Sequence, residues 1–315
     1  QKEIRTRIKS TKNIAKITKA MELVSAAKMR KAQSLAVASR PYATLSSELL
    51  KNLVSRTGEA NHPLIKRVAP EDDWDNHFER LARNHSHKLA GGISNSVRDG
   101  SPKRILAILI TSDRGLAGAF NTNVINEAID LTRAPLVEQG APLLSSFDFI
   151  TVGRKGADAL RRQGYNIIAA FNGKEDAHAI AQMAMDDFLA FKYEKVFVVY
   201  SEFVSTLVQK PNILQLLPFD KQETRNKKQD DFLFEPSPDE VLDNLVVRVI
   251  EFAVYQSLVE AVASEHSARM VAMRNANEAA GDLIDDLSLS YNQARQAGIT
   301  RELSEISAAK LAMEG

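Results

Sequence analysis

The stretch from Leu242 to Ala294 reads LDNLVVRVIEFAVYQSLVEAVASEHSARMVAMRNANEAAGDLIDDLSLSYNQA, and its spacing decides most of the fold. Apolar residues recur at alternating intervals of three and four throughout. This repeat predicts a supercoiled helix, which spans roughly 100 Å if unbroken and needs a second helix to cover its stripe. The stripe consists of Leu242, Leu245, Val249, Phe252, Gln256, Val259, Ala263, His266, Met270, Met273, Asn277, Ala280, Ile284, Leu287, Tyr291 and Ala294.

The N-terminal segment predicts the second long helix. No glycine occurs before Gly58, and the first proline is Pro41, where a kink is possible. We expect its apolar stripe to form the seam of a coiled coil with the C-terminal helix. That stripe consists of Ile14, Ile17, Met21, Val24, Leu35, Ala38, Tyr42, Leu45 and Leu49.

Charge favours pairing of the two ends. Residues 1–56 hold thirteen Lys and Arg against three Asp and Glu, a net charge of +10, whereas residues 236–315 hold six against thirteen, a net charge of −7. We expect an antiparallel pair, with the intervening domain returning the chain near its start. The basic residues come at helical spacing without interleaved aromatics, which argues against a nucleic-acid partner.

Between these helices, alternating strands and helices predict an α/β layer sandwich, largely parallel. The fold class is therefore α/β plus a long antiparallel coiled coil, with a Rossmann-like layered domain between paired terminal helices. We expect helices at 1–60 and 239–315, an exposed insertion at 61–101, the α/β domain at 102–220 and a linker at 221–238. The expected strands are 104–113, 147–153, 166–172, 195–203 and 212–219, and the expected helices between them are 121–132, 154–163 and 177–191.

Composition excludes several classes of function. The chain has no cysteine, so disulfides, thiolate metal sites and thiol catalysis are ruled out. It has no run of eighteen apolar residues, so we expect no membrane span. No catalytic motif is present, and His77, His85, His87 and Glu79 follow no zinc template, so we expect no metal or cofactor.

The stretch TSDRGLAGAFNTNV, from Thr111 to Val124, leaves a nucleotide-binding alternative open. It follows a predicted strand and precedes a helix, where Rossmann-type folds hold a pyrophosphate. However, it lacks both the G-x-G-x-x-G and the P-loop spacing, and a structural turn explains its glycines equally well. The same two readings, anion site or turn, apply to GRKG at Gly153 to Gly156.

Four motifs together resemble one family. SEHSARMVAMRNANEAAGDLIDDLSLSYNQARQAGITRELSEI (Ser264 to Ile306) is similar to the C-terminal helix of F-type ATP synthase γ subunits. KEIRTRIKSTKNIAKITKAMELVSAAKMRKAQ (Lys2 to Gln33) resembles their N-terminal helix, and SDRGLAGAFN and VGRKG resemble their middle domain. The match covers nearly the whole chain in the right order.

The resemblance implies a non-catalytic central-stalk rotor, present once per complex. The paired helices would turn inside a hexamer of α and β subunits, and the α/β domain would touch the ε subunit and the membrane-embedded c-ring. The chain would lie peripherally on an energy-coupling membrane, either at the cytoplasmic face of a bacterial plasma membrane or at the matrix face of the mitochondrial inner membrane.

The resemblance also implies roles for particular residues. Arg295 and Gln296 match positions that hydrogen-bond a loop of a catalytic subunit, and Thr300 and Glu302 lie in the same region. Met21 and Arg269 match positions linked to coupling efficiency. From the sequence alone, Met21 is equally explained as a seam residue, and Arg269 as a solvated flank.

Two alternatives stay open at this point. One is a Rossmann-like nucleotide-binding enzyme with a coiled-coil hairpin, and the other is a coiled-coil scaffold that forms a homodimer. The segment from Arg67 to Gly100 is longer than the family's usual link into the first strand, and it is open whether it contacts another subunit.

Overall fold

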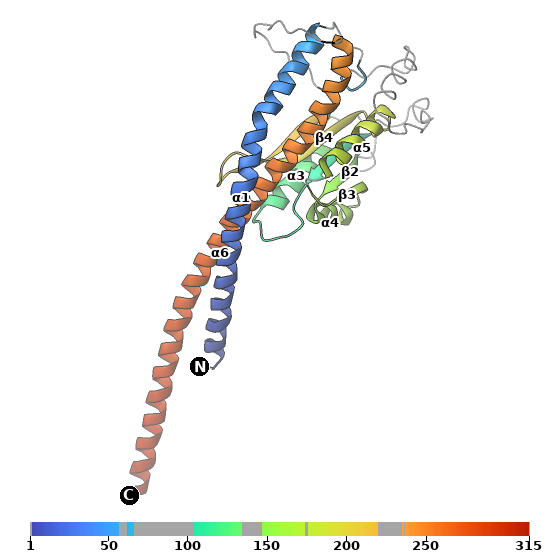
Figure 1. Ribbon diagram of the computed structural model, residues 1–315. Helices are drawn as coiled ribbons and strands as arrows, with labels where there is room; N and C mark the ends of the chain where they lie inside the picture. Colours follow the sequence, from blue (N-terminus) through green and yellow to red (C-terminus); the bar gives the residue numbers. More distant parts are fainter. Residues whose placement is uncertain are drawn as a thin grey trace. The chain divides into compact units, whose positions relative to one another are not determined.

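The computed structural model describes residues 2–56, 62–65, 104–133, 147–173, 176–219, 235 and 237–314 (Figure 1). The chain forms two compact units, one of Gln1–Ala27 with Arg269–Gly315 and one of Lys28–Ala268. The two terminal helices, α1 (Lys2–Arg56) and α6 (Pro238–Glu314), each contribute to both units. The insertion expected at 61–101 lies outside the described residues except at 62–65, and so does the linker expected at 221–238 except at 235, 237 and 238.

The second unit contains a five-stranded sheet in the order β3-β2-β1-β4-β5. Neighbouring strands are parallel except β4 and β5, which form an antiparallel hairpin. The elements are β1 (Ile105–Ile110), α3 (Phe120–Arg133), β2 (Phe147–Val152), α4 (Arg154–Arg162), β3 (Asn166–Phe171), α5 (Ala177–Leu189), β4 (Lys195–Phe203) and β5 (Gln209–Leu217).

The central strands of the sheet are buried on both faces. Successive side chains of a strand point to opposite faces, so each of these strands contributes to two cores. In β1, Leu106 and Ile108 belong to a core that includes buried residues of α5, α6 and the end of α1. Their neighbours Ala107 and Leu109 belong to a second core with α3 and α4. This burial on both faces explains why β1 reads as a continuous apolar run in the sequence.

The expected fold class is confirmed. Every strand and helix expected between the terminal helices is present, with ends that shift by at most three residues, as at Gln209 where β5 begins. The sheet is mixed because β5 returns beside β4 through a short turn, which an antiparallel pair permits and a parallel pair does not.

The two terminal helices run antiparallel. In the second unit, the rings of Tyr42 and Phe252 lie 4.6 Å apart, and Ser39 Oγ lies 2.6 Å from Gln256 Oε1, so rising numbers in α1 meet falling numbers in α6. In the first unit, the two helices again run in opposite directions (Figure 1). Helix α1 continues through Pro41.

Candidate interface on the terminal helices

Between Thr11 and Ala36, the seam of α1 consists mostly of small and polar side chains, with Met29 as the large apolar exception. Its buried and half-buried positions alternate at intervals of four and three, as a coiled-coil seam requires. Small side chains let two helices approach closely and leave room for the larger side chains of α6. The seam positions along this part of α1 are Ile4, Ile8, Thr11, Ala15, Thr18, Glu22, Ser25, Met29, Ala32 and Ala36.

In the first unit, the apolar stripe expected to form this seam lies mostly elsewhere, so that part of the prediction is wrong. In the second unit, Tyr42 of the stripe does contact Phe252 of α6. Ile14, Ile17 and Val24 are 51%, 59% and 55% exposed, and Met21 is half-buried. Hydrophobicity alone selected the wrong row because the residues that allow close approach are small rather than apolar. The alternating run of Thr, Ala and Ser was visible in the sequence and carried the correct register.

Glu22 is a charged residue inside this seam. Its carboxylate lies 3.0 Å from Lys19 Nζ and 3.5 Å from Arg274 Nε on α6. The hydrogen bond from Lys19, followed by the charges of Lys19 and Arg274, lowers the pKa of Glu22 from its usual value, so the carboxylate is ionised at neutral pH. This cross-helix pair places the acid on α1 and the base on α6, opposite to the overall charge balance of the two ends.

The register predicted for α6 is confirmed, since every one of its sixteen positions is buried or half-buried. Beyond Gly298 the side chains of α6 are no longer buried. Every side chain described from Ile299 onward is exposed, including Ile299, Leu303 and Ile306. Figure 1 shows the C-terminal end of α6 extending past the N-terminal end of α1, which explains why helix α1 does not cover those side chains.

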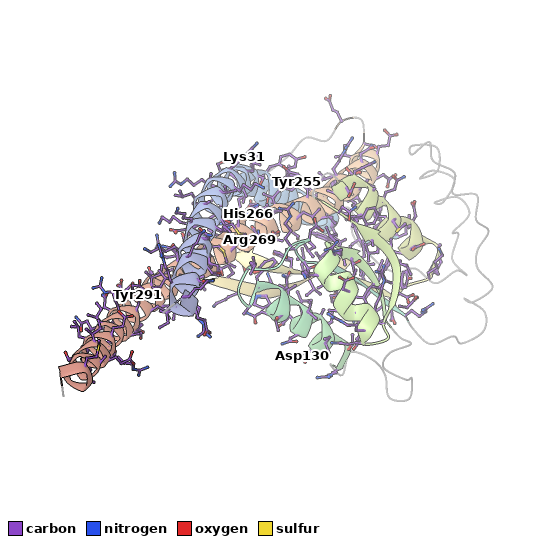
Figure 2. All side chains as sticks on the ribbon, turned by 90° about the horizontal axis from the view of Figure 1, so that it is seen from below. Lys31, Asp130, Tyr255, His266, Arg269 and Tyr291 are labelled. Atoms are coloured by element: carbon purple, nitrogen blue, oxygen red, sulfur yellow. The ribbon has the colours of Figure 1, made fainter. Side chains whose placement is uncertain are left out.

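The residues singled out by resemblance fall into two groups. Arg295, Gln296, Thr300 and Glu302 are all exposed, near and beyond the end of the paired region. In contrast, Arg269 on α6 is only 7% exposed (Figure 2), so the interpretation as a solvated flank is wrong.

The structure does not favour a phosphate site at the carboxyl ends of β1 and β2. An anion at a helix N-terminus binds to backbone N–H groups that have no intrahelical partner. The first three N–H groups of α4 already donate within this chain: Arg154 to Asp113 Oδ1 at 3.1 Å, Lys155 to the Ser112 carbonyl at 3.1 Å and Gly156 to Thr111 Oγ1 at 2.9 Å. A phosphate at this point would have to displace these partners.

The glycines of the GRKG turn have a packing role instead. Gly153 adopts φ +87°, and a Cβ at this position would lie 2.2 Å from the Thr111 carbonyl oxygen. A Cβ on Gly156 would lie 2.8 Å from Thr111 Oγ1. The β1 and β2 loops therefore approach each other too closely for any side chain, and the structural interpretation of this turn is favoured.

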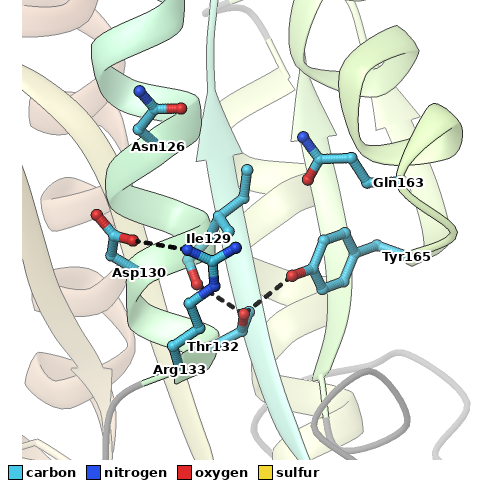
Figure 3. A pocket seen from close by; sticks show the side chains of 7 residues that line it. All are labelled: Asn126, Ile129, Asp130, Thr132, Arg133, Gln163 and Tyr165. Atoms are coloured by element: carbon cyan, nitrogen blue, oxygen red, sulfur yellow. Dashed lines mark hydrogen bonds and ion pairs between the residues drawn. The ribbon is translucent and has the colours of Figure 1, made fainter.

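A pocket of about 720 Å³ lies between the end of α3 and the turn into β3 (Figure 3). Its polar groups bond to one another, with Thr132 Oγ1 3.0 Å from Tyr165 Oη and Arg133 Nη1 3.6 Å from Asp130 Oδ1. It lies at the amino end of β3, whereas open α/β sheets bind ligands at the carboxyl ends of their strands. The pocket therefore gives no support to a Rossmann-type nucleotide site.

Comparison with known proteins identifies the family. A family model described as ATP synthase matches residues 1–313. The ATP synthase gamma chain of Pelotomaculum thermopropionicum is 41% identical, and the alignment covers 99% of each chain. Those of Chloroflexus aurantiacus and Coxiella burnetii are 37% and 38% identical over 99% of this chain, and over 98% and 99% of their own. This chain belongs to the ATP synthase gamma chain family.

Solved structures support the same fold for this gamma chain. A chain in the cryo-EM structure of Euglena gracilis mitochondrial ATP synthase in rotational state 3 aligns with a TM-score of 0.61 at 19% identity, over 99% of this chain and 94% of that one. A chain of the rotor of the same enzyme in rotational state 1 aligns with a TM-score of 0.56 at 19% identity, over 95% and 98%. The likeness shows that long terminal helices flanking an α/β sheet are a known arrangement.

Proposed function

We propose that this gamma chain is the central-stalk rotor of an F-type ATP synthase, turning inside a hexamer of α and β subunits to couple ion translocation to ATP synthesis or hydrolysis. Besides family membership, the outer surface of the first unit supports this. Ile14, Ile17 and Val24 are exposed in a row on one helix, and the exposed end of α6 carries Ile299 and Leu303. None of the described residues covers these side chains, so they fit a surface that is buried against partner subunits.

The asymmetry of this pair of helices explains how one copy acts on three catalytic sites. A pair of different helices cannot present the same side chains to three identical neighbours at once. Each catalytic site therefore meets a different face and adopts a different conformation. Turning the rotor exchanges these faces in sequence, and that exchange links rotation to the chemistry on the β subunits.

The contacts that turn with the rotor need to be weak enough to break. Arg295 and Gln296, with Thr300 and Glu302 nearby, are assigned to a loop of a catalytic subunit. All four are exposed, and exposed polar contacts contribute about 0–1 kcal/mol each. Contacts of that size guide the hexamer without locking it.

Met21 and Arg269 are assigned to coupling through the packing of the coil. Met21 is half-buried beside the seam residue Glu22, and Arg269 is buried. Substitution at either position would alter the surface that the coil presents, which makes them positioning residues rather than catalytic ones.

The second unit is assigned to the ε subunit and the c-ring, and the chain to the periphery of an energy-coupling membrane. Among the described residues, none of the helices is both long and apolar enough to cross a bilayer. An attachment through partner subunits accounts for a membrane-bound location. The catalytic sites are assigned to the hexamer. In this chain, the N–H groups at the α4 N-terminus already have partners in Asp113, Ser112 and Thr111.

The test is Mg-ATP hydrolysis by purified α and β subunits with and without this chain. We expect one copy of the chain per hexamer and sharply higher turnover. Ile17→Glu places a charge in the exposed row and should weaken assembly at least tenfold. The matched control Met183→Glu, on the exposed face of α5, should assemble normally. A chain that neither binds nor stimulates the hexamer would overturn the proposal.

The nucleotide-binding enzyme is tested separately by titrating the isolated chain with ATP or NAD. We expect no saturable binding. Tight, saturable binding that is lost on substitution in the loop from Thr111 to Val124 would favour the enzyme over the rotor.

A further inference from the structure

The β4–β5 hairpin extends past the rest of the sheet. Pairing of β1 with β4 ends at Leu109 and Val199, whereas pairing of β4 with β5 continues to Phe203 and Gln209. The last residues of β4 therefore have a strand on one side only. Backbone carbonyls on the open side require partners from elsewhere, because buried unpaired carbonyls are costly.

At the end of β4, the side chain of Phe203 packs against both helices of the coil. Phe203, at the end of β4, is 7% exposed and forms a small core with Ala32 of α1 and Ala263 of α6. Each helix contributes an alanine, which leaves a notch that a larger side chain would fill. The ring thus occupies a position that depends on the relative placement of both helices.

Hydrogen bonds from the coil reach carbonyls at the end of β4 and in the turn that follows it. Ser264 Oγ donates to the Ser201 carbonyl at 3.0 Å and Ser267 Oγ donates to the Thr206 carbonyl at 2.6 Å. Three residues apart, the two serines lie on one face of α6, and both are 0% exposed, so water does not reach their hydroxyls. The Thr206 carbonyl also accepts from Gln209 Nε2 at 3.0 Å, whereas Ser264 is the side chain that bonds the Ser201 carbonyl. From α1, Arg40 Nη2 donates to the Phe203 carbonyl at 3.2 Å.

We propose that Phe203, Ser264, Ser267 and Arg40 form a torque clamp, which carries rotational load between the α/β sheet and the coil. The inference rests on the proposed rotor function. The large apolar core between the sheet and α6 resists separation, but apolar contacts are non-directional, and packed helices slide past one another at small cost. Directional hydrogen bonds and a ring held by both helices resist that sliding.

The clamp should matter most when the rotor works against a load. Under free ATP hydrolysis little torque crosses the sheet, so turnover is retained. Against an ion gradient the full torque passes through this junction. A loosened junction would let the coil slip relative to the sheet, and the gradient would fall while hydrolysis continues.

The test uses the complete enzyme in vesicles with Ser264→Ala and Ser267→Ala combined. We expect ATP hydrolysis within twofold of the unmodified enzyme and a steady-state ion gradient at least threefold lower. The matched control is Ser288→Ala, a half-buried serine of the same helix whose hydroxyl bonds only to its own helix, at the Ile284 carbonyl. The control should leave both quantities unchanged.

Unchanged coupling in the double variant would overturn the clamp. A parallel fall in hydrolysis and gradient, in proportion to lost assembly, would also overturn it, because that result indicates only structural support. If the unmodified chain itself fails to couple hydrolysis to a gradient, the rotor proposal fails, which separates the two hypotheses.

If the double variant does not assemble into the complete enzyme, a second measurement on the isolated chain tests the clamp. Amide hydrogen exchange of the full chain should accelerate at least tenfold from Phe203 to Gln209 while exchange in β1 and β2 stays the same. Equal acceleration throughout the sheet would mean general destabilisation and would count against a local clamp.

Discussion

At the residue scale, the chain uses glycines and a buried carboxylate to fix how the loops and strand ends of the sheet meet. Gly153 allows the β1 and β2 loops to touch, and its φ of +87° favours a residue without a Cβ. At the opposite end of the strands, Asp148 accepts hydrogen bonds from Arg104 Nη2 at 2.8 Å, Asn166 Nδ2 at 2.7 Å and Tyr193 Oη at 2.8 Å. Each residue fixes the geometry of neighbouring chain segments.

The close approach at Gly153 makes a sharp prediction. Gly153→Ala should lower the free energy of unfolding by more than about 3 kcal/mol, because strain at positive φ adds to a clash with Thr111. Gly164→Ala is the matched control, since Gly164 has φ +82° but nothing within 4 Å of the added Cβ, and it should cost only about 1–2 kcal/mol. Urea unfolding followed by circular dichroism measures both, and equal losses would contradict the clash.

The buried carboxylate of Asp148 leads to a second prediction about stability. Burial, and then the hydrogen bond to Asp148, raise the pKa of Tyr193, so its hydroxyl stays protonated and donates. Asp148→Ala should cost about 1–3 kcal/mol because it leaves the buried hydroxyl of Tyr193 without its acceptor, whereas the exposed Arg104 and Asn166 can turn to water. Asp130→Ala, which removes an exposed ion pair with Arg133, should cost less than about 1 kcal/mol in the same unfolding experiment. A similar cost for both would show that burial of Asp148 contributes little.

At the scale of elements, α1 separates two tasks between two rows of residues. The small row, which includes Thr18 and Ser25, packs in the coil, and the apolar row, which includes Ile17 and Val24, faces outward. A coiled coil whose large apolar residues face outward gains little stability from its own seam. Those residues can instead be buried against another protein.

Neighbouring substitutions test this division. Ser25→Leu forces a large side chain into a seam position that is 3% exposed and should destabilise the coil by about 1–3 kcal/mol. Val24→Ser, one residue away at an exposed position, should change stability by less than about 0.5 kcal/mol. Thermal unfolding of the full chain, followed by the circular dichroism of its helices, measures both changes. A larger loss of stability for Val24→Ser than for Ser25→Leu would mean that the apolar row forms the seam.

At the scale of the whole molecule, the function depends on surfaces that the chain leaves uncovered. Family membership, the exposed row on α1 and the exposed end of α6 together support a rotor. The exposed polar residues at that end, Arg295 and Gln296, lie where rotation would bring them past successive partners.

Arg295→Ala combined with Gln296→Ala should leave the isolated chain folded, because both side chains are exposed. Turnover of the assembled enzyme should fall roughly tenfold, which corresponds to the loss of about two hydrogen bonds at the working interface. Arg301→Ala, another exposed base of the same helix, is the control and should have less than a twofold effect. Unchanged turnover in the double variant would remove both residues from the mechanism.

The sequence by itself determined the element types, the layered sheet and the register of α6. Strands buried on both faces produce unbroken apolar runs such as β1, and a long coil produces a sustained three-four repeat, so both are local properties that one sequence displays. The pairing of the ends also followed from the chain, because the stripe of α6 needs a second helix to cover it and the two ends carry opposite net charge.

Only the tertiary structure decided which row of α1 is buried and which contacts join the sheet to the coil. Ile17 and Thr18 both lie on regular helical rows, and close approach to α6 rather than hydrophobicity selects Thr18 for the seam. Likewise, Phe203 and Ser264 are far apart in the sequence, and their role depends on how far β4 extends beyond β1. Such choices depend on the shape of the partner element, which no local pattern contains.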